Sequence, residues 1–320
     1  GGGELDEDLE MLIRSHNLYG QRELRGESRA TQQLRERVQL VGKQSHCRVL
    51  IQGETGTGKE TVAGLIHEYS TRSAEPLICF NCADLSPHLL ESRLFGHEKG
   101  AFTGALQARE GAFEQADGGT LFLDEVAELS ADAQAGLLRV LEEGRFYRLG
   151  GSEERSVDVR VVAATNRNLP GLVAEGRFRD DLYHRLATVP VVIPPLRERP
   201  EDIAPIADDF WRHLTGNGRL NKAQTEALTS YPWPGNVREL RNVLERAQAL
   251  GQSDFAKLLE EHRHLSAGLP GNESVYAENL EEMKIQHIRR ILRKYDGNIT
   301  RAANALGIAR NTLKKYGGES

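Results

Sequence analysis

The 320-residue chain lacks three features: enough cysteine for disulfide pairing, a long apolar run, and a basic amino terminus. Its three cysteines cannot form a framework of disulfides, so a reducing cytoplasm is the expected compartment. The best apolar run, residues 186–196, contains three prolines and is shorter than the ~20 residues that a membrane span needs. The acidic start GGGELDEDLE does not resemble a signal peptide. We therefore expect no membrane association.

Two of the cysteines, Cys79 and Cys82, form a CxxC pair, a spacing that zinc and redox sites also use. On the strand predicted there, positions three apart point to opposite faces, so the two thiols cannot bind one metal together. A structural zinc site needs four ligands, and the histidines show no paired spacing. The pair is therefore expected to be structural.

The net charge of −6 taken alone argues against a nucleic-acid-binding protein, but charge is distributed unevenly. Between Met283 and Tyr316 there are nine Lys or Arg residues and one Asp, so this segment carries +8 and the remainder −14. A chain of this length holds about two or three domains. The distribution predicts a small basic module attached to a larger acidic one.

Apolar strands alternate with helical segments up to residue 193, which is typical of a parallel sheet covered by helices on both faces. Residues 201–259 look purely helical, with breaks at 215–218 and 231–235. A Gly-, Pro- and Ser-containing linker precedes short basic helices. The predicted parts are a lead-in at 1–24, an α/β domain at 25–195, a helical domain at 196–264, a linker at 265–280, and a terminal module at 281–320.

A glycine-rich segment, GETGTGKET, follows a predicted strand and opens a helix, which is the context of a phosphate-binding loop. Its backbone N–H groups and the helix N-terminus favour phosphate, and Lys59 adds a charge for the β- and γ-phosphates. The general motif has Ser or Thr after the lysine, where this chain has Glu60. The predicted nucleotide-binding residues of this loop are Gly53, Glu54, Thr55, Gly56, Thr57, Gly58, Lys59, Glu60 and Thr61.

A second apolar strand, residues 119–123, runs into Asp124 and Glu125. Carboxylates at the end of a buried strand are costly unless they meet a cation. Asp124 is predicted to bind Mg²⁺ or its water, and Glu125 to orient and polarise the attacking water. Together with Lys59, these residues predict an ATP-hydrolysing site.

The segment ESRLFGHEKGAFTGA, residues 91–105, contains the GAFTGA sequence, and with the motifs above it resembles the AAA+ ATPases that activate sigma-54 RNA polymerase. The resemblance covers about residues 24–316 and implies an AAA+ P-loop NTPase fold with a helical lid. In these bacterial enhancer-binding proteins Glu commonly follows the loop lysine, so Glu60 fits. The resemblance implies that ATP turnover moves the GAFTGA loop, which contacts sigma-54 and remodels the closed promoter complex.

Residues 100–105 are called the signature loop below. Two glycines bracket Ala-Phe-Thr and provide permissive hinges, and an apolar Phe at an exposed tip is costly unless it meets a partner. The alternative is a surface turn in which Phe102 is tucked inward. The expected sigma-54 contacts are Gly100, Ala101, Phe102, Thr103, Gly104 and Ala105.

Further roles follow from the resemblance one position at a time. Asn166 matches the sensor I residue and Arg238 sensor II, while Asn81 matches the residue that restrains the catalytic glutamate. Arg179 and Arg185 match the arginine fingers that reach a neighbour's ATP, which implies a homo-oligomeric ring, most often a hexamer. The segment 145–157 matches the hairpin that supports the signature loop.

The basic terminal module reads NITRAANALGIARNTL and predicts a helix-turn-helix of the Fis type. Its recognition helix looks about one turn short, which leaves specific DNA reading open. A basic helical pair that serves only oligomerisation is the alternative. The expected DNA contacts are Arg301, Arg310, Asn311, Thr312 and Lys314.

These features predict an ATP- and Mg²⁺-dependent sigma-54 activator of the bacterial cytoplasm, whose partners are the sigma-54 RNA polymerase holoenzyme and enhancer DNA. Two alternatives are another AAA+ remodelling ATPase and a non-activating DNA-binding regulator that kept the fold. Residues 1–24 are too few for a receiver domain. Either a regulatory protein acts in trans, or a sensor domain has been removed.

Overall fold

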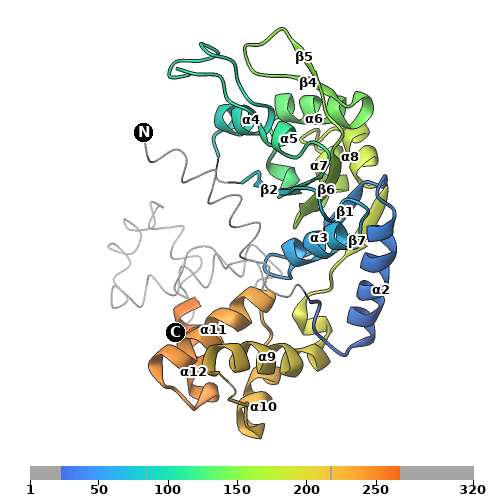
Figure 1. Cartoon of the computed structure of the whole chain (residues 1–320). Helices are drawn as coiled ribbons and strands as arrows, with labels where there is room; N and C mark the ends of the chain where they lie inside the picture. Colours follow the sequence, from blue (N-terminus) through green and yellow to red (C-terminus); the bar gives the residue numbers. More distant parts are fainter. Residues whose placement is uncertain (1–22, 84, 217, 267–320) are drawn as a thin grey trace, which may run out of the picture. The chain divides into compact units, whose positions relative to one another are not determined.

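The computed structural model describes residues 23–83, 85–216 and 218–266 (Figure 1). Residues up to Leu258 form one compact unit, and a second unit begins at Leu259. The terminal module, nearly all of the linker and most of the lead-in predicted from the sequence lie outside the described residues; the first two linker positions, 265–266, belong to a helix. Within the described part, no helix is long and apolar enough to span a bilayer.

The α/β part is built on one parallel sheet of five strands in the order β2-β3-β6-β1-β7, which confirms the predicted fold class. The central strands β3 and β6 are buried along nearly their whole length and apolar in their middle, because helices cover both faces of the sheet. The strands are β1 (Val49–Gln52), β2 (Leu77–Asn81), β3 (Thr120–Asp124), β6 (Arg160–Thr165) and β7 (Val189–Val192).

Helices cover the two faces of this sheet (Figure 1). On one face, α2 (Arg29–Lys43) and α3 (Lys59–Glu68) share a core with alternate residues of β1 and β6. On the other face the core is mostly aliphatic and includes stacked phenylalanines: the Phe95 and Phe113 ring centroids lie 5.7 Å apart. The helices there are α4 (Pro87–Phe95), α5 (Ala112–Gln115), α6 (Ala131–Glu143), α7 (Leu169–Ala174) and α8 (Asp180–Leu186).

A two-stranded antiparallel hairpin of β4 (Arg145–Tyr147) and β5 (Glu154–Ser156) leaves this layer after α6. Helix α6 ends at Gly144, which adopts the left-handed conformation (φ 67°) that suits a C-terminal glycine. The hairpin is anchored to the core by Phe146, which is 2% exposed. The structure thus contains a hairpin in the segment, residues 145–157, where one was predicted.

The helical lid follows β7 through two short 3₁₀ turns, Leu196–Glu198 and Pro200–Asp202. Its core surrounds Trp233, which is fully buried and donates its Nε1 proton to the Leu228 carbonyl. A break at residues 251–254 was not predicted; it follows from Gly251, which ends a helix at φ 60°. The lid helices are α9 (Ile203–Thr215), α10 (Lys222–Ser230), α11 (Asn236–Leu250) and α12 (Phe255–Ser266).

A buried polar cluster joins the beginning of the lid to the beginning of α2. The Asp202 carboxylate is fully buried and accepts hydrogen bonds from the Ser28 backbone N–H at 2.7 Å, the Ser28 hydroxyl at 2.8 Å and the Thr31 hydroxyl at 2.6 Å. The Arg199 guanidinium lies 3.8 Å from the same carboxylate. Because Ser28 also caps α2, Asp202 holds the helix start against the lid.

Replacing Asp202 with Ala should therefore destabilise the protein markedly. The substitution leaves several buried donors and the Arg199 charge without their acceptor, which costs about 3 kcal/mol. Thermal unfolding followed by circular dichroism measures the effect, and the exposed neighbour Glu201→Ala serves as the matched control. Equal unfolding midpoints for the two variants would show that the cluster does not stabilise the fold.

Candidate functional site

Polar residues gather at the carboxyl ends of the parallel strands, where ligands bind in open α/β sheets. The phosphate-binding loop follows β1, Asp124 ends β3, and Asn166 follows β6. The register of the sheet places Asn81 directly beside Asp124. Residues far apart in the chain thus meet at one edge because the strands are parallel and adjacent.

The phosphate-binding loop has the backbone that its glycines permit. Gly56 and Gly58 adopt positive φ angles of 80° and 101°, and a side chain at Gly56 would collide with the Gly235 carbonyl of the lid. Lys59 begins α3 and is 7% exposed, and its Nζ donates to the carbonyls of Gly53 at 2.9 Å and Glu54 at 3.1 Å. These contacts hold the ammonium inside the loop, where a phosphate would meet it.

The two acids at the end of β3 face this lysine. Lys59 Nζ lies 3.9 Å from Glu125 Oε1. Burial raises the pKa values of Asp124 and Glu125 and lowers the pKa of Lys59, while the attraction between the opposite charges limits all three shifts. Glu125 also has a left-handed backbone (φ 55°), which is strained for a non-glycine residue and is found most often at functional sites.

The donor set fits a magnesium ion that is shared with phosphates. Mg²⁺ in nucleotide sites uses one or two carboxylates and completes its shell with phosphate oxygens and water. Asp124 is a half-buried carboxylate whose charge is poorly solvated, as such a ligand should be. Bound there with a nucleotide, the ion would neutralise phosphate charge. Among the described residues, no group of three or more His, Cys, Asp or Glu side chains could hold a metal without such help.

The lid reaches the phosphate-binding loop through contacts that the sequence analysis missed. Arg197 forms two hydrogen bonds to the Glu54 carboxylate, at 2.8 and 2.6 Å, which lower the pKa of Glu54. The Asn236 amide donates to Glu54 Oε2 and to the Thr55 carbonyl, both at 3.1 Å. These partners are 143 and 182 positions apart, and no short motif links them. The only signal was local: Asn236 follows Pro-Gly, a turn sequence.

The predicted sensor residues take different positions. The Asn166 amide donates to the Thr55 hydroxyl at 3.0 Å, so it touches the phosphate-binding loop. The Arg238 backbone N–H donates to the Gly56 carbonyl at 3.2 Å, and its side chain is exposed. The Asn81 amide oxygen accepts from Ala83 N at 2.9 Å, a contact within its own turn. The structure thus places Asn166 and Arg238 at the loop, and the restraint of Glu125 by Asn81 stays a prediction.

The two predicted arginine fingers lie at the surface of the single chain. Arg179 pairs with Asp181 at 2.9 Å and Arg185 with Glu142 at 3.2 Å, and all four side chains are 41–50% exposed. Exposed pairs of this kind contribute little stability, so either guanidinium can exchange its partner at low cost.

The signature loop has the predicted hinge glycines, but its phenylalanine does not lie at an exposed tip. Gly100 and Gly104 have positive φ angles, as predicted for hinges, and Thr103 is exposed. Phe102, expected at an exposed tip, is instead half-buried, with its ring edge-on to those of His88 and His97 at 5.2 and 5.0 Å between centroids. The inward-tucked alternative therefore describes Phe102 in this structure. Edge-to-face aromatic contacts explain the preference.

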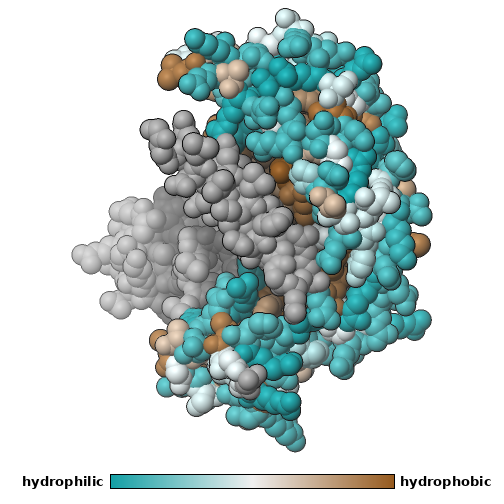
Figure 2. Space-filling model, in the orientation of Figure 1, coloured by the Kyte–Doolittle hydropathy of each residue, from teal (hydrophilic) through white to brown (hydrophobic). Residues whose placement is uncertain are grey.

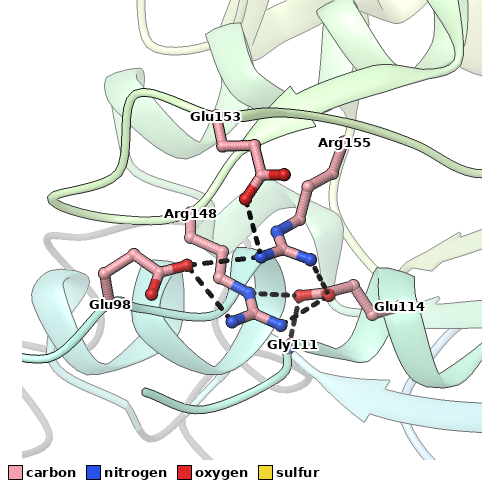
Figure 3. Close-up of polar contacts among 6 residues, drawn as sticks. All are labelled: Glu98, Gly111, Glu114, Arg148, Glu153 and Arg155. Atoms are coloured by element: carbon pink, nitrogen blue, oxygen red, sulfur yellow. Dashed lines mark hydrogen bonds and ion pairs between the residues drawn. The ribbon is translucent and has the colours of Figure 1, made fainter. Parts of the chain in front are cut away.

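Two arginines of the hairpin tie it to the segment that carries the signature loop (Figure 3). Arg148 contacts Glu114 at 2.7 Å and Glu98 at 3.2 Å. Arg155 reaches the same two carboxylates, each at 3.4 Å. Because Arg148 and Glu114 are 10% and 12% exposed, this network is better shielded from water than a surface ion pair.

Comparison with known proteins agrees with this geometry. A family model described as the sigma-54 interaction domain matches residues 24–192, which is more than half of the chain. The chain belongs to the sigma-54 interaction domain family. Further models match at residues 197–274, an AAA+ ATPase lid domain, and at residues 280–316, a bacterial regulatory protein of the Fis family.

Two curated regulatory proteins are similar to this chain over most of its length. The phenol regulator MopR of Acinetobacter guillouiae is 48% identical over 287 residues, covering 84% of this chain and 51% of MopR. The transcriptional regulatory protein ZraR of Escherichia coli is 45% identical over 294 residues, covering 90% of this chain and 66% of ZraR. The chain thus spans about half to two thirds of the length of these relatives.

Among solved structures, NtrX from Brucella abortus in complex with ATP superimposes with a TM-score of 0.70 at 34% identity, covering 97% of this chain and 71% of NtrX. A crystal structure of the same protein with ADP gives a TM-score of 0.69 at 33% identity, with coverages of 98% and 73%. The AAA+ fold expected of a sigma-54 interaction domain is therefore confirmed.

Replacing Asp124 with Asn should stabilise the nucleotide-free sigma-54 domain. Burial raises the pKa of Asp124, so its charged form carries a penalty that is fully present above the raised pKa and vanishes below the ordinary one. We expect a higher melting temperature for the variant at neutral pH, and a smaller gain as the pH approaches ~4.

Thermal unfolding at the two pH values measures this difference. Asp181→Asn is the matched control, because its ion pair with Arg179 lowers the pKa of Asp181 and its charge is favourable. That variant should melt no higher than the unsubstituted protein. A lower melting temperature for Asp124→Asn at neutral pH would show that the carboxylate is stabilising and that its burial carries no penalty.

Proposed function

We propose that the chain hydrolyses ATP and uses the energy to activate sigma-54 RNA polymerase. The observation that carries the proposal is the buried Lys59 facing the paired acids Asp124 and Glu125 at the end of a parallel sheet. A cation that binds phosphate and carboxylates that bind Mg²⁺ and water are the parts that phosphoryl transfer to water requires. The similarity to a protein solved with ATP supports the choice of nucleotide.

In this proposal each group at the strand ends has one role. The loop backbone and Lys59 bind the β- and γ-phosphates, and Asp124 holds Mg²⁺, which supplies charge neutralisation when bound. Glu125 orients the attacking water and accepts its proton as the oxygen bonds to the γ-phosphorus and the bond to ADP breaks. The raised pKa of Glu125 suits this task, because proton transfer is most effective when the base's pKa approaches the working pH.

We propose that the remaining contacts to the nucleotide come from the two sensor residues and from the arginine fingers of a neighbouring copy of the chain. Asn166 already contacts the phosphate-binding loop and Arg238 stands beside it, so both can register the γ-phosphate. Arg179 and Arg185 are exposed and only loosely paired, which supports their use as fingers in a neighbour's site. Fingers that act in a neighbour's site require a homo-oligomeric ring, which we propose to be a hexamer as the family resemblance implies. A regulatory protein in trans is a further proposed partner.

The signature loop is proposed to contact sigma-54 and remodel the closed promoter complex. Its hinge glycines allow movement, and the ionic network of Arg148 and Arg155 joins its base to the hairpin. The match to the Fis family at residues 280–316 supports tethering to enhancer DNA by the basic module. The predicted DNA-contacting residues, which include Arg310 and Asn311, lie outside the described residues.

Replacing Glu125 with Gln should abolish ATP turnover and preserve ATP binding. Gln keeps the size of the side chain but cannot accept the water's proton, and loss of a general base costs about 100-fold or more in rate. Phosphate release measures turnover, and a fluorescent ATP analogue measures binding. Glu128→Gln, at a partly exposed acid three positions on, is the control. Unchanged hydrolysis in Glu125→Gln would remove that residue from its role.

Replacing Thr103 or Phe102 with Ala should separate hydrolysis from activation. Both residues lie between α4 and α5, outside the phosphate-binding loop and the strands that end at the site, so ATP turnover should persist. Open-complex formation should be lost with purified holoenzyme on a sigma-54 promoter, detected by permanganate footprinting. Open complexes that survive both substitutions would show that the signature loop is not the contact.

A further inference from the structure

Leu106 is the most exposed of the large apolar side chains in the part of the chain that the structure describes. It is 81% exposed, compared with 68% for Leu250 and 65% for Leu40. Isolated exposed leucines are common on protein surfaces and need no explanation by themselves. Leu106 differs from the other two in its position, because it directly follows the signature loop.

The backbone beside Leu106 is well defined. Gly100 N–H donates to the Ala105 carbonyl at 2.8 Å and closes the signature loop into a compact turn. Leu106 N–H in turn donates to the Gly104 carbonyl at 2.9 Å, and the neighbouring Ala105 is 6% exposed. The exposure of Leu106 is therefore set by a hydrogen-bonded turn with a buried neighbour.

Phe102 and Leu106 are presented in opposite ways. The Phe102 ring is held against His88 and His97, whereas the Leu106 side chain is left to solvent. Figure 2 shows a small hydrophobic patch on the loop that projects beyond α4, in the upper left of the view. In this conformation the apolar contact that the loop offers to a partner is provided chiefly by Leu106.

We propose that Leu106 is a contact residue for sigma-54 and extends the apolar contact surface of the signature loop by one side chain. The inference deepens the proposed function and rests on it. The occupant is sigma-54 because Leu106 lies inside the segment matched by the sigma-54 interaction domain and is continuous with the loop proposed to bind that protein. An exposed leucine of this kind gains free energy only when an apolar surface covers it.

The test compares sigma-54 binding by four forms of the full chain: unsubstituted, Leu106→Ala, Leu106→Met and Leu250→Ala. Phe102→Ala is measured beside them as the reference for the proposed function. Fluorescence anisotropy with labelled sigma-54 and a slowly hydrolysed ATP analogue gives the dissociation constants. We expect Leu106→Ala to weaken binding about fivefold or more, from the lost apolar burial. Leu106→Met should bind nearly as the unsubstituted chain because its apolar contact is kept, and the exposed control Leu250→Ala should be unchanged.

The rate of ATP hydrolysis and the ring mass from light scattering are measured on the same samples. They distinguish the loss of a sigma-54 contact from a change in the ATPase or in ring assembly. Hydrolysis should be equal in all four forms. Equal sigma-54 affinity for Leu106→Ala and the unsubstituted chain overturns the inference, and the proposed function stands if Phe102→Ala still loses binding. A change in ring mass with sigma-54 affinity intact also overturns it, because Leu106 would then contact a second copy. If the unsubstituted chain does not bind sigma-54, the proposed function fails and the inference falls with it.

Discussion

The attraction between Lys59 and the two acids that end β3 is the interaction on which the rest of the site depends. None of the three groups is well solvated, and burial alone would push each toward its neutral form. Their mutual attraction opposes that shift and keeps a cation and two carboxylates charged in one place. This balance requires β1 and β3 to run parallel in the same sheet, because only then do the loop after one and the acids after the other meet.

The lid also contacts this edge of the sheet, through hydrogen bonds to the phosphate-binding loop. Glu54, inside the phosphate-binding loop, is held by Arg197 and Asn236, and the side-chain amide oxygen Oδ1 of Asn236 also accepts a hydrogen bond from the buried Leu196 N–H at 2.8 Å. One asparagine therefore joins the phosphate-binding loop, the start of the lid and the first turn of α11. Because these hydrogen bonds join the phosphate-binding loop to the lid, a movement of one of them must also move the other.

Much of this could be predicted because the signals are local. Strand positions followed from continuous apolar runs, the phosphate-binding loop from glycine spacing, and Asp124 and Glu125 from their place at a strand end. The Arg197–Glu54 pair could not be predicted, because its partners meet only after β7 has been placed next to β1 in the sheet. The position of Phe102 escaped prediction for the same reason: His88 belongs to α4, and nothing in the sequence states which way its ring faces.

The ionic network and the glycines divide the signature loop region into a fixed part and a movable one. Arg148 and Arg155 bind the segment before the loop at Glu98 and the segment after it at Glu114, so both ends are fastened to the same hairpin. Between them, positive-φ glycines leave the backbone free to change. A displacement of the hairpin would therefore move both ends of the signature loop together. Coupling of this kind needs only a fastened base and a hinge, and the chain provides both.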